Sequence, residues 1–114
     1  MRFRQVVWWA AAVEVSSAIA RGERERVLKP PDTAIALELL AALGREWQEI
    51  IPSDEVRDLA KAILAGHSLR AADALQLAAG LVWCREKPKG RMFLCADERL
   101  CEAAEQAGFS LLRP

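Results

Sequence analysis

Apolar residues along the chain fall into short unbroken runs separated by stretches with helical spacing. An unbroken apolar run without polar alternation is typical of a strand buried on both faces, as in a parallel sheet. The clearest run is Val6 to Ala10, which is rich in β-branched and aromatic residues. Such runs predict buried strands at residues 6–10 and 92–96. Residues 47–51 form a short strand candidate, and residues 109–112 are expected to form the last strand.

Apolar residues three and four apart predict amphipathic helices between these strands. Asp32, Ser53, Ser68 and Asp97 precede such stretches and are expected to begin helices, and glycines are expected to end them. The helix over residues 69–84 is apolar almost all round, so we expect it deep in the molecule. The predicted helices cover residues 13–20, 32–44, 53–66, 69–84 and 97–108.

The element order β-α-α-β-α-α-β-α-β contains no Asn-Gly hairpin signal. Strands that alternate with helices predict a parallel sheet with helices on both faces, an α/β fold. The 114 residues, of which 53% are apolar, suffice for one domain spanning residues 1–114 with a core of its own.

Composition bears on compartment and partners. The formal net charge is zero, so a polyanion must be held by local charge. No apolar run approaches the ~20 residues of a membrane span, so no membrane partner is expected. Residues 1–20 resemble a signal peptide, but Glu14 interrupts the pattern. We therefore expect a cytoplasmic protein.

Three cysteines, Cys84, Cys95 and Cys101, form an odd set without a C-x-x-C pair. This pattern predicts reduced thiols. A zinc site built from them and His67, the only histidine, is disfavoured because the spacings match no standard motif.

Three acidic residues, Glu14, Asp73 and Asp97, are the candidates for chemistry. Glu14 and Asp97 follow predicted strands, at the sheet edge where α/β folds place ligands, and Asp73 lies one turn into the most apolar helix. Each also has a purely structural interpretation. Glu14 suits the first turn of a helix, Asp97 suits an N-cap, and Asp73 suits an ion pair with Arg70.

If the three carboxylates converge, they repel one another unless a cation neutralises them. Mg²⁺ or Mn²⁺ binds carboxylate oxygens and shares its remaining positions with water and phosphate. Such a site polarises a phosphodiester and generates hydroxide from bound water. We therefore expect a divalent metal site for phosphoryl chemistry.

Several segments resemble PIN-domain proteins, specifically the VapC-type toxins of bacterial toxin–antitoxin pairs. The most specific is the R-A-A-D-A-L-Q-L-A helix at residues 70–78. The A-D-E-R-L segment at residues 96–100 comes next, and then the strand at residues 6–10 followed by V-E at residues 13–14. The resemblance implies a three-layer α/β/α domain and a Mg²⁺ or Mn²⁺ dependent endoribonuclease. It also implies a homodimer, a cognate antitoxin, and Glu14, Asp73 and Asp97 as catalytic metal ligands.

The chain departs from the family at its start. The family's first strand, which ends in an Asp and lies centrally in the sheet, has no counterpart here, so the resemblance implies an N-terminally truncated domain. Two strands would then lack a pairing neighbour. The alternatives are direct pairing of the two halves, a second copy in the gap, or a start upstream of Met1. We expect weakened metal affinity and little nuclease activity in this form.

Candidate RNA contacts lie beside the acidic residues. Arg70 and Arg99 are placed to bind phosphates, with ion pairing as their structural alternative. Lys87, Lys89 and Arg91 form a basic loop that either binds RNA or serves as a solvated turn. Trp8 and Trp9 are expected in the core rather than stacked on bases.

Two other functions remain open from the sequence. The first is a non-catalytic interaction module that binds an antitoxin-like helix or a second copy through an exposed apolar edge. The second is a receiver-like domain that holds Mg²⁺ at its strand ends, although no Lys is placed like the usual phosphate-binding partner.

Overall fold

A computed structural model describes residues 5–113 of the chain. The chain forms two compact units, Met1–Glu49 and Ile50–Pro114, and each is considered by itself. The single domain expected over residues 1–114 stays a prediction. The basic start of the signal-like segment, at residues 1–4, lies outside the described residues.

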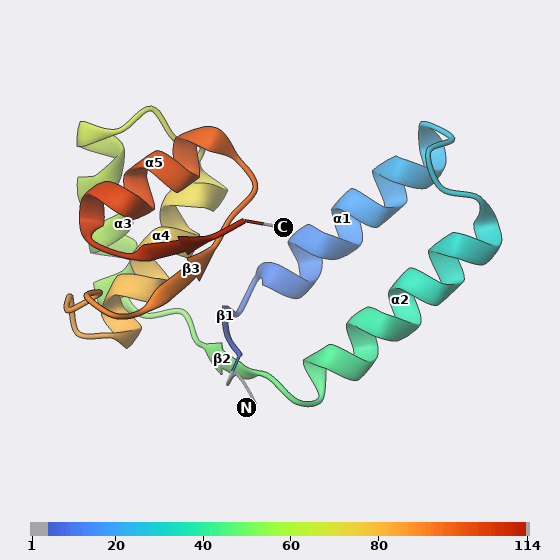
Figure 1. Cartoon of the computed structure of the whole chain (residues 1–114), viewed down its shortest axis with the longest axis horizontal. Helices are drawn as coiled ribbons and strands as arrows, with labels where there is room; N and C mark the ends of the chain where they lie inside the picture. Colours follow the sequence, from blue (N-terminus) through green and yellow to red (C-terminus); the bar gives the residue numbers. More distant parts are fainter. Residues whose placement is uncertain (1–4, 114) are drawn as a thin grey trace. The chain divides into compact units, whose positions relative to one another are not determined.

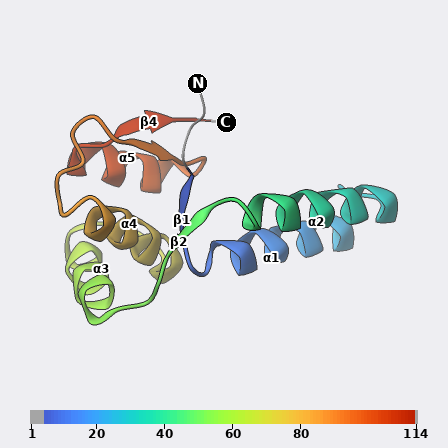
Figure 2. The ribbon, with the colours of Figure 1, turned by 90° about the horizontal axis from the view of Figure 1, so that it is seen from below.

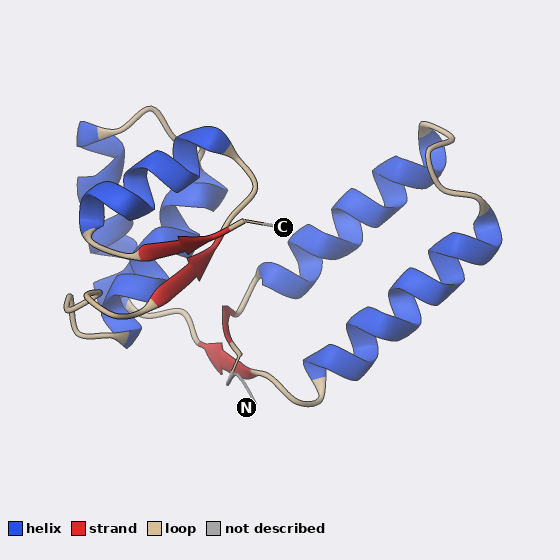
Figure 3. Ribbon diagram, viewed as in Figure 1, coloured by secondary structure: helices blue, strands red, loops and turns tan. Residues whose placement is uncertain are grey.

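The order of helices and strands matches the order predicted from the sequence (Figure 1). The protein is a mixed α/β structure, mostly helical with very short strands (Figure 3). The bounds are β1 Val6–Trp8, α1 Ala11–Arg24, α2 Pro30–Gly44, β2 Gln48–Ile50, α3 Asp54–Gly66, α4 Ala71–Trp83, β3 Met92–Leu94, α5 Glu98–Ala107 and β4 Ser110–Leu112.

The first unit is built around two helices, α1 and α2, which lie side by side (Figure 2). Strand β1 pairs with β2 in a two-stranded sheet. Trp8 is buried, as expected, but the expectation for Trp9 was wrong: the strand ends at Trp8 and Trp9 begins a turn, which leaves its side chain 55% exposed.

Helix α2 starts earlier than the sequence analysis predicted. It begins at Pro30, a residue whose fixed φ suits the first turn of a helix. Asp32 therefore lies inside the first turn, where its Oδ2 accepts a hydrogen bond of 3.3 Å from the backbone N–H of Lys29. Asp32 still satisfies a free backbone donor at the helix start, but from within the helix.

The second unit is organised around α4, which contacts both α3 and α5 (Figure 2). The prediction that this helix is deeply placed is confirmed, since five of its residues are buried. Its apolar side chains pack on the rings of Phe93 and Phe109, whose centroids are 5.2 Å apart. A Cβ at Gly80 would lie 3.4 Å from Phe93, so the glycine lets α4 approach these rings closely.

Strands β3 and β4 pair in parallel, with Phe93 opposite Leu111. Parallel pairing was predicted, but burial of the whole 92–96 run was not borne out. Phe93 and Cys95 are buried, whereas Leu94 is 58% exposed, because within the second unit the helices cover one face of this small sheet. Among the described residues β1–β2 and β3–β4 are separate sheets. Direct pairing of the two halves stays a prediction. The three-layer arrangement stays a prediction.

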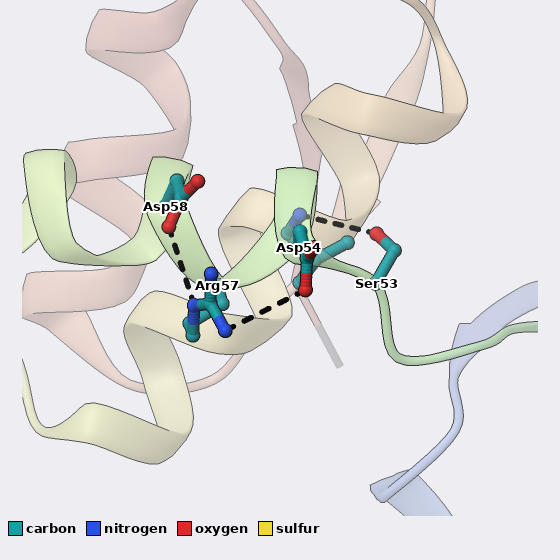
Figure 4. A network of polar contacts seen from close by, with 5 residues as sticks. Ser53, Asp54, Arg57 and Asp58 are labelled. Carbon is teal, nitrogen blue, oxygen red and sulfur yellow. Dashed lines mark hydrogen bonds and ion pairs between the residues drawn. The ribbon is translucent and has the colours of Figure 1, made fainter.

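Helix α3 begins with the N-cap that the sequence predicts. The Ser53 hydroxyl accepts a hydrogen bond of 3.2 Å from the backbone N–H of Val56. On its solvent side, Arg57 forms ion pairs with Asp54 at 3.5 Å and Asp58 at 3.2 Å (Figure 4). These exposed pairs contribute little to stability, so the buried side of α3, with Val56 and Ala60, holds it against α4.

None of the helices over residues 5–113 combines the length with the apolar character that a membrane span requires.

Two glycines give opposite predictions for stability. Gly108 ends α5 with φ of 112°, and a Cβ there would lie 3.0 Å from Pro88. Gly108→Ala should therefore lower the free energy of unfolding by about 1–2 kcal/mol or more. Gly66, the last residue of α3, has open space around its Cα, so Gly66→Ala should raise it by about 0.4–1 kcal/mol. Denaturant unfolding measures both, and equal effects of the two substitutions would contradict the described turn.

Candidate acidic site

Asp73 lies in the first turn of α4, and its side chain is half-buried. The helix is fixed there because Ala74 and Leu77, on its inner side, are fully buried. Arg70 is the N-cap residue, and its carbonyl accepts the backbone N–H of Ala74 at 3.0 Å. Asp73 is thus a carboxylate held near solvent by a rigid, buried helix.

Asp97 is the N-cap of α5, as the sequence predicts. Its Oδ1 accepts a hydrogen bond of 3.0 Å from the backbone N–H of Leu100. Leu100 is buried in the core of the second unit, so this bond fixes the Asp97 side chain at the start of the helix. The other carboxylate oxygen, Oδ2, has no described hydrogen-bond partner among residues 5–113.

The two carboxylates act on each other electrostatically. Burial raises the pKa of Asp73 above its ordinary value of 3.8, and the negative charge of Asp97 raises it further. The positive charge of Arg70 opposes both effects without reversing them. The negative charge of Asp97 thus reaches Asp73, so these two of the predicted site residues, here called the acidic pair, are coupled electrostatically within the second unit.

Arg70 and Arg99, the predicted phosphate-binding residues, are both exposed. The expected ion pair between Arg70 and Asp73 does not form among the described residues, although the charge of Arg70 is felt by Asp73. Arg99 is the second residue of α5, two positions after Asp97. Both guanidinium groups are thus carried by the elements that hold the acidic pair, and RNA binding by them stays a prediction.

Glu14 belongs to the first unit. It lies in the first turn of α1 and is half-buried, in agreement with its structural interpretation as a first-turn acid. Its backbone N–H donates to the carbonyl of Ala10 at 3.1 Å. Because Asp73 and Asp97 lie in the other unit, a site that joins all three stays a prediction.

The oxygen donors of the acidic pair suit a hard divalent cation, which would relieve the repulsion that raises the pKa of Asp73. Within the described part of the chain, no group of three or more His, Cys, Asp or Glu side chains is arranged to hold a metal ion. The described donor set is therefore two carboxylates. Mg²⁺ is often bound by one or two carboxylates, with water and substrate phosphate completing its coordination.

A disulfide joins Cys95 and Cys101, and it encloses Asp97 in the loop that it closes. The prediction of reduced thiols is wrong for this pair and holds only for Cys84, which is free. The sequence did not predict this pair, because no C-x-x-C motif marks it. The turn into α5 brings the two Cα atoms to 5.7 Å. Both cysteines are buried, so the bridge ties the start of α5 to the end of β3.

Comparisons with models of protein families, with curated proteins and with solved structures find no match to this chain.

The raised pKa of Asp73 predicts how stability depends on pH. A carboxyl group whose folded-state pKa exceeds its unfolded value of 3.8 makes folding less favourable as pH rises through that range. Asp73→Asn should therefore raise the melting temperature at pH 7, and this gain should shrink as the pH falls through the raised pKa of Asp73 toward 3.8, below which it should vanish. Thermal unfolding at several pH values measures it. Glu105→Gln, at an exposed position of α5, is the control, and a similar gain in both variants would refute the prediction.

Proposed function

We propose that the chain is a metal-dependent endoribonuclease domain of the PIN type, the toxin component of a type II toxin–antitoxin pair. The observation that carries the proposal is the electrostatic coupling of Asp73 with Asp97, two acids from different elements. A structural carboxylate at a helix start normally has a lowered pKa, because the helix dipole stabilises its charge. The pKa of Asp73 is raised instead, which is typical of functional sites.

In this proposal Asp73 and Asp97 hold Mg²⁺ or Mn²⁺ against a phosphodiester. The bound ion supplies Lewis-acid polarisation of the phosphate and lowers the pKa of a water ligand. Asp97 uses Oδ1 for its helix cap, which orients Oδ2 as the ligand oxygen. The exposed guanidinium groups of Arg70 and Arg99 bind neighbouring phosphates. Glu14 is proposed as the third carboxylate of the site.

A second candidate function, a non-catalytic interaction module, is favoured by α2. This helix lies wholly within the described residues. It is mostly apolar, yet none of its 15 residues is buried. Its exposed side chains include Ile35 and Leu39, at 57% and 60% exposure, with Leu43 one turn further on. Such a face suits an antitoxin-like helix or a second copy of the chain.

Metal binding separates the two functions. Calorimetric titration of Mn²⁺ into the wild-type chain should give saturable heat, and Asp73→Asn and Asp97→Asn should each weaken the affinity by about tenfold or more, because each removes a charged ligand. Asparagine at position 97 keeps the N-cap, so the fold is retained. Glu105→Gln should bind as the wild type does.

RNA cleavage by the same proteins tests the chemistry. Cleavage should be weak, as expected from the sequence, should require Mn²⁺ or Mg²⁺, and should be lost in Asp73→Asn. Absence of heat with Mn²⁺ in the wild type would reject the nuclease and leave the interaction module. Metal binding that both Asn variants retain would reject the assigned ligands.

A further inference from the structure

The loop between α4 and β3 follows the end of α4 in the second unit (Figure 1). Its residues carry a concentrated positive charge. We call residues 84–91 the basic loop. It holds four basic side chains and one acidic one, a net charge of +3 in a chain whose formal net charge is zero. All four cations are exposed, and none forms an ion pair with another described residue: Arg85, Lys87, Lys89 and Arg91.

Backbone hydrogen bonds hold the basic loop in one conformation. The N–H of Glu86 donates to the carbonyl of Leu81 at 2.7 Å, and the carbonyl of Arg91 accepts the N–H of Ser110 at 2.9 Å. Pro88 is buried. The loop is therefore anchored at both ends and at its centre, while its charges face solvent.

The start of the loop adopts a conformation that side chains disfavour. Arg85 and Glu86 have φ values of 54° and 56°, in the left-handed region. Each such residue costs about 1–2 kcal/mol relative to glycine. A turn that serves only for solubility does not need this backbone conformation. The helix dipole explains a cation directly after α4, but its influence fades within one turn and does not extend to Lys89 and Arg91.

Arg91 lies over the indole ring of Trp83, with its guanidinium carbon 4.9 Å from the ring centroid. Trp83 is the last residue of α4 and is 38% exposed. The stack holds the planar guanidinium in a defined position at the surface. A guanidinium plane fixed in this way is a surface on which an unpaired nucleobase stacks.

We propose that the basic loop binds single-stranded RNA at a site separate from the acidic pair. Lys87 and Lys89 contact phosphates, and a base stacks on Arg91 where it lies over Trp83. Asp73 and Cys84, at opposite ends of α4, are eleven positions apart, which corresponds to about 16 Å along the helix. The choice of RNA over DNA as the bound strand rests on the proposed function. The proposal that the basic loop binds a single-stranded nucleic acid does not.

Fluorescence anisotropy with an end-labelled oligouridine in EDTA tests this site without the metal and without cleavage. Lys87→Glu and Lys89→Glu should each weaken binding by about threefold or more and make the salt dependence shallower, since each removes a phosphate contact. Lys61→Glu, an equal charge change at an exposed position of α3, is the matched control and should have a smaller effect. Equal losses in all three variants would overturn the proposal.

The stacking part has its own test. Arg91→Lys keeps the positive charge but removes the planar guanidinium group. It should therefore weaken oligouridine binding by about fivefold or more. Oligothymidine of the same length should bind more weakly than oligouridine, and inorganic polyphosphate should show no loss with Arg91→Lys. Unchanged oligouridine affinity in Arg91→Lys would overturn the stacking assignment, and DNA bound as tightly as RNA would overturn only the choice of RNA as the bound strand. If the wild-type chain binds oligouridine but does not cleave RNA, only the proposed nuclease function is rejected.

Discussion

Burial of α4 is the constraint on which both candidate sites depend. The helix is apolar on nearly every side, and it packs against α3, α5 and the rings of Phe93 and Phe109. Because the middle of the helix is fixed, its two ends have fixed positions as well. Asp73 stands at the first turn, and Trp83 stands at the last residue, where the basic loop begins. Substitutions that loosen the middle of α4 would therefore disturb both ends together.

The charges at the two ends of α4 have the signs that a helix dipole favours, which offers a purely structural explanation for them. The pKa of Asp73 argues against that explanation at the acidic end. Stabilisation by the dipole and by Arg70 would lower this pKa, yet burial and the charge of Asp97 raise it. Burial and the charge of Asp97 therefore disfavour the ionised form of Asp73, and a carboxyl group perturbed in this way is typical of functional sites.

Local signals in the sequence predicted the elements well, whereas burial and pairing depended on information that is not local. The caps formed by Ser53 and Asp97 follow from residue type and spacing, and both were predicted correctly. The exposure of Trp9 and Leu94 was not predicted, because it depends on how few strands each sheet contains. The Cys95–Cys101 disulfide was missed because a turn, not a motif, brings the two residues together. For the candidate acidic site, the sequence singled out Asp73 and Asp97, and the structure adds their electrostatic coupling. The position of Arg91 over the ring of Trp83 became visible only in three dimensions.

The central claim is that the charge of Asp97, at the start of α5, raises the pKa of Asp73 in the first turn of α4. The most direct measurement is an NMR titration of the Asp73 carboxyl group in the wild type and in Asp97→Asn, which keeps the helix cap. The account predicts that the pKa of Asp73 lies above 3.8 in the wild type and falls toward that value in the variant. An identical pKa in the two proteins would contradict the account, because the two carboxylates would then not form a pair.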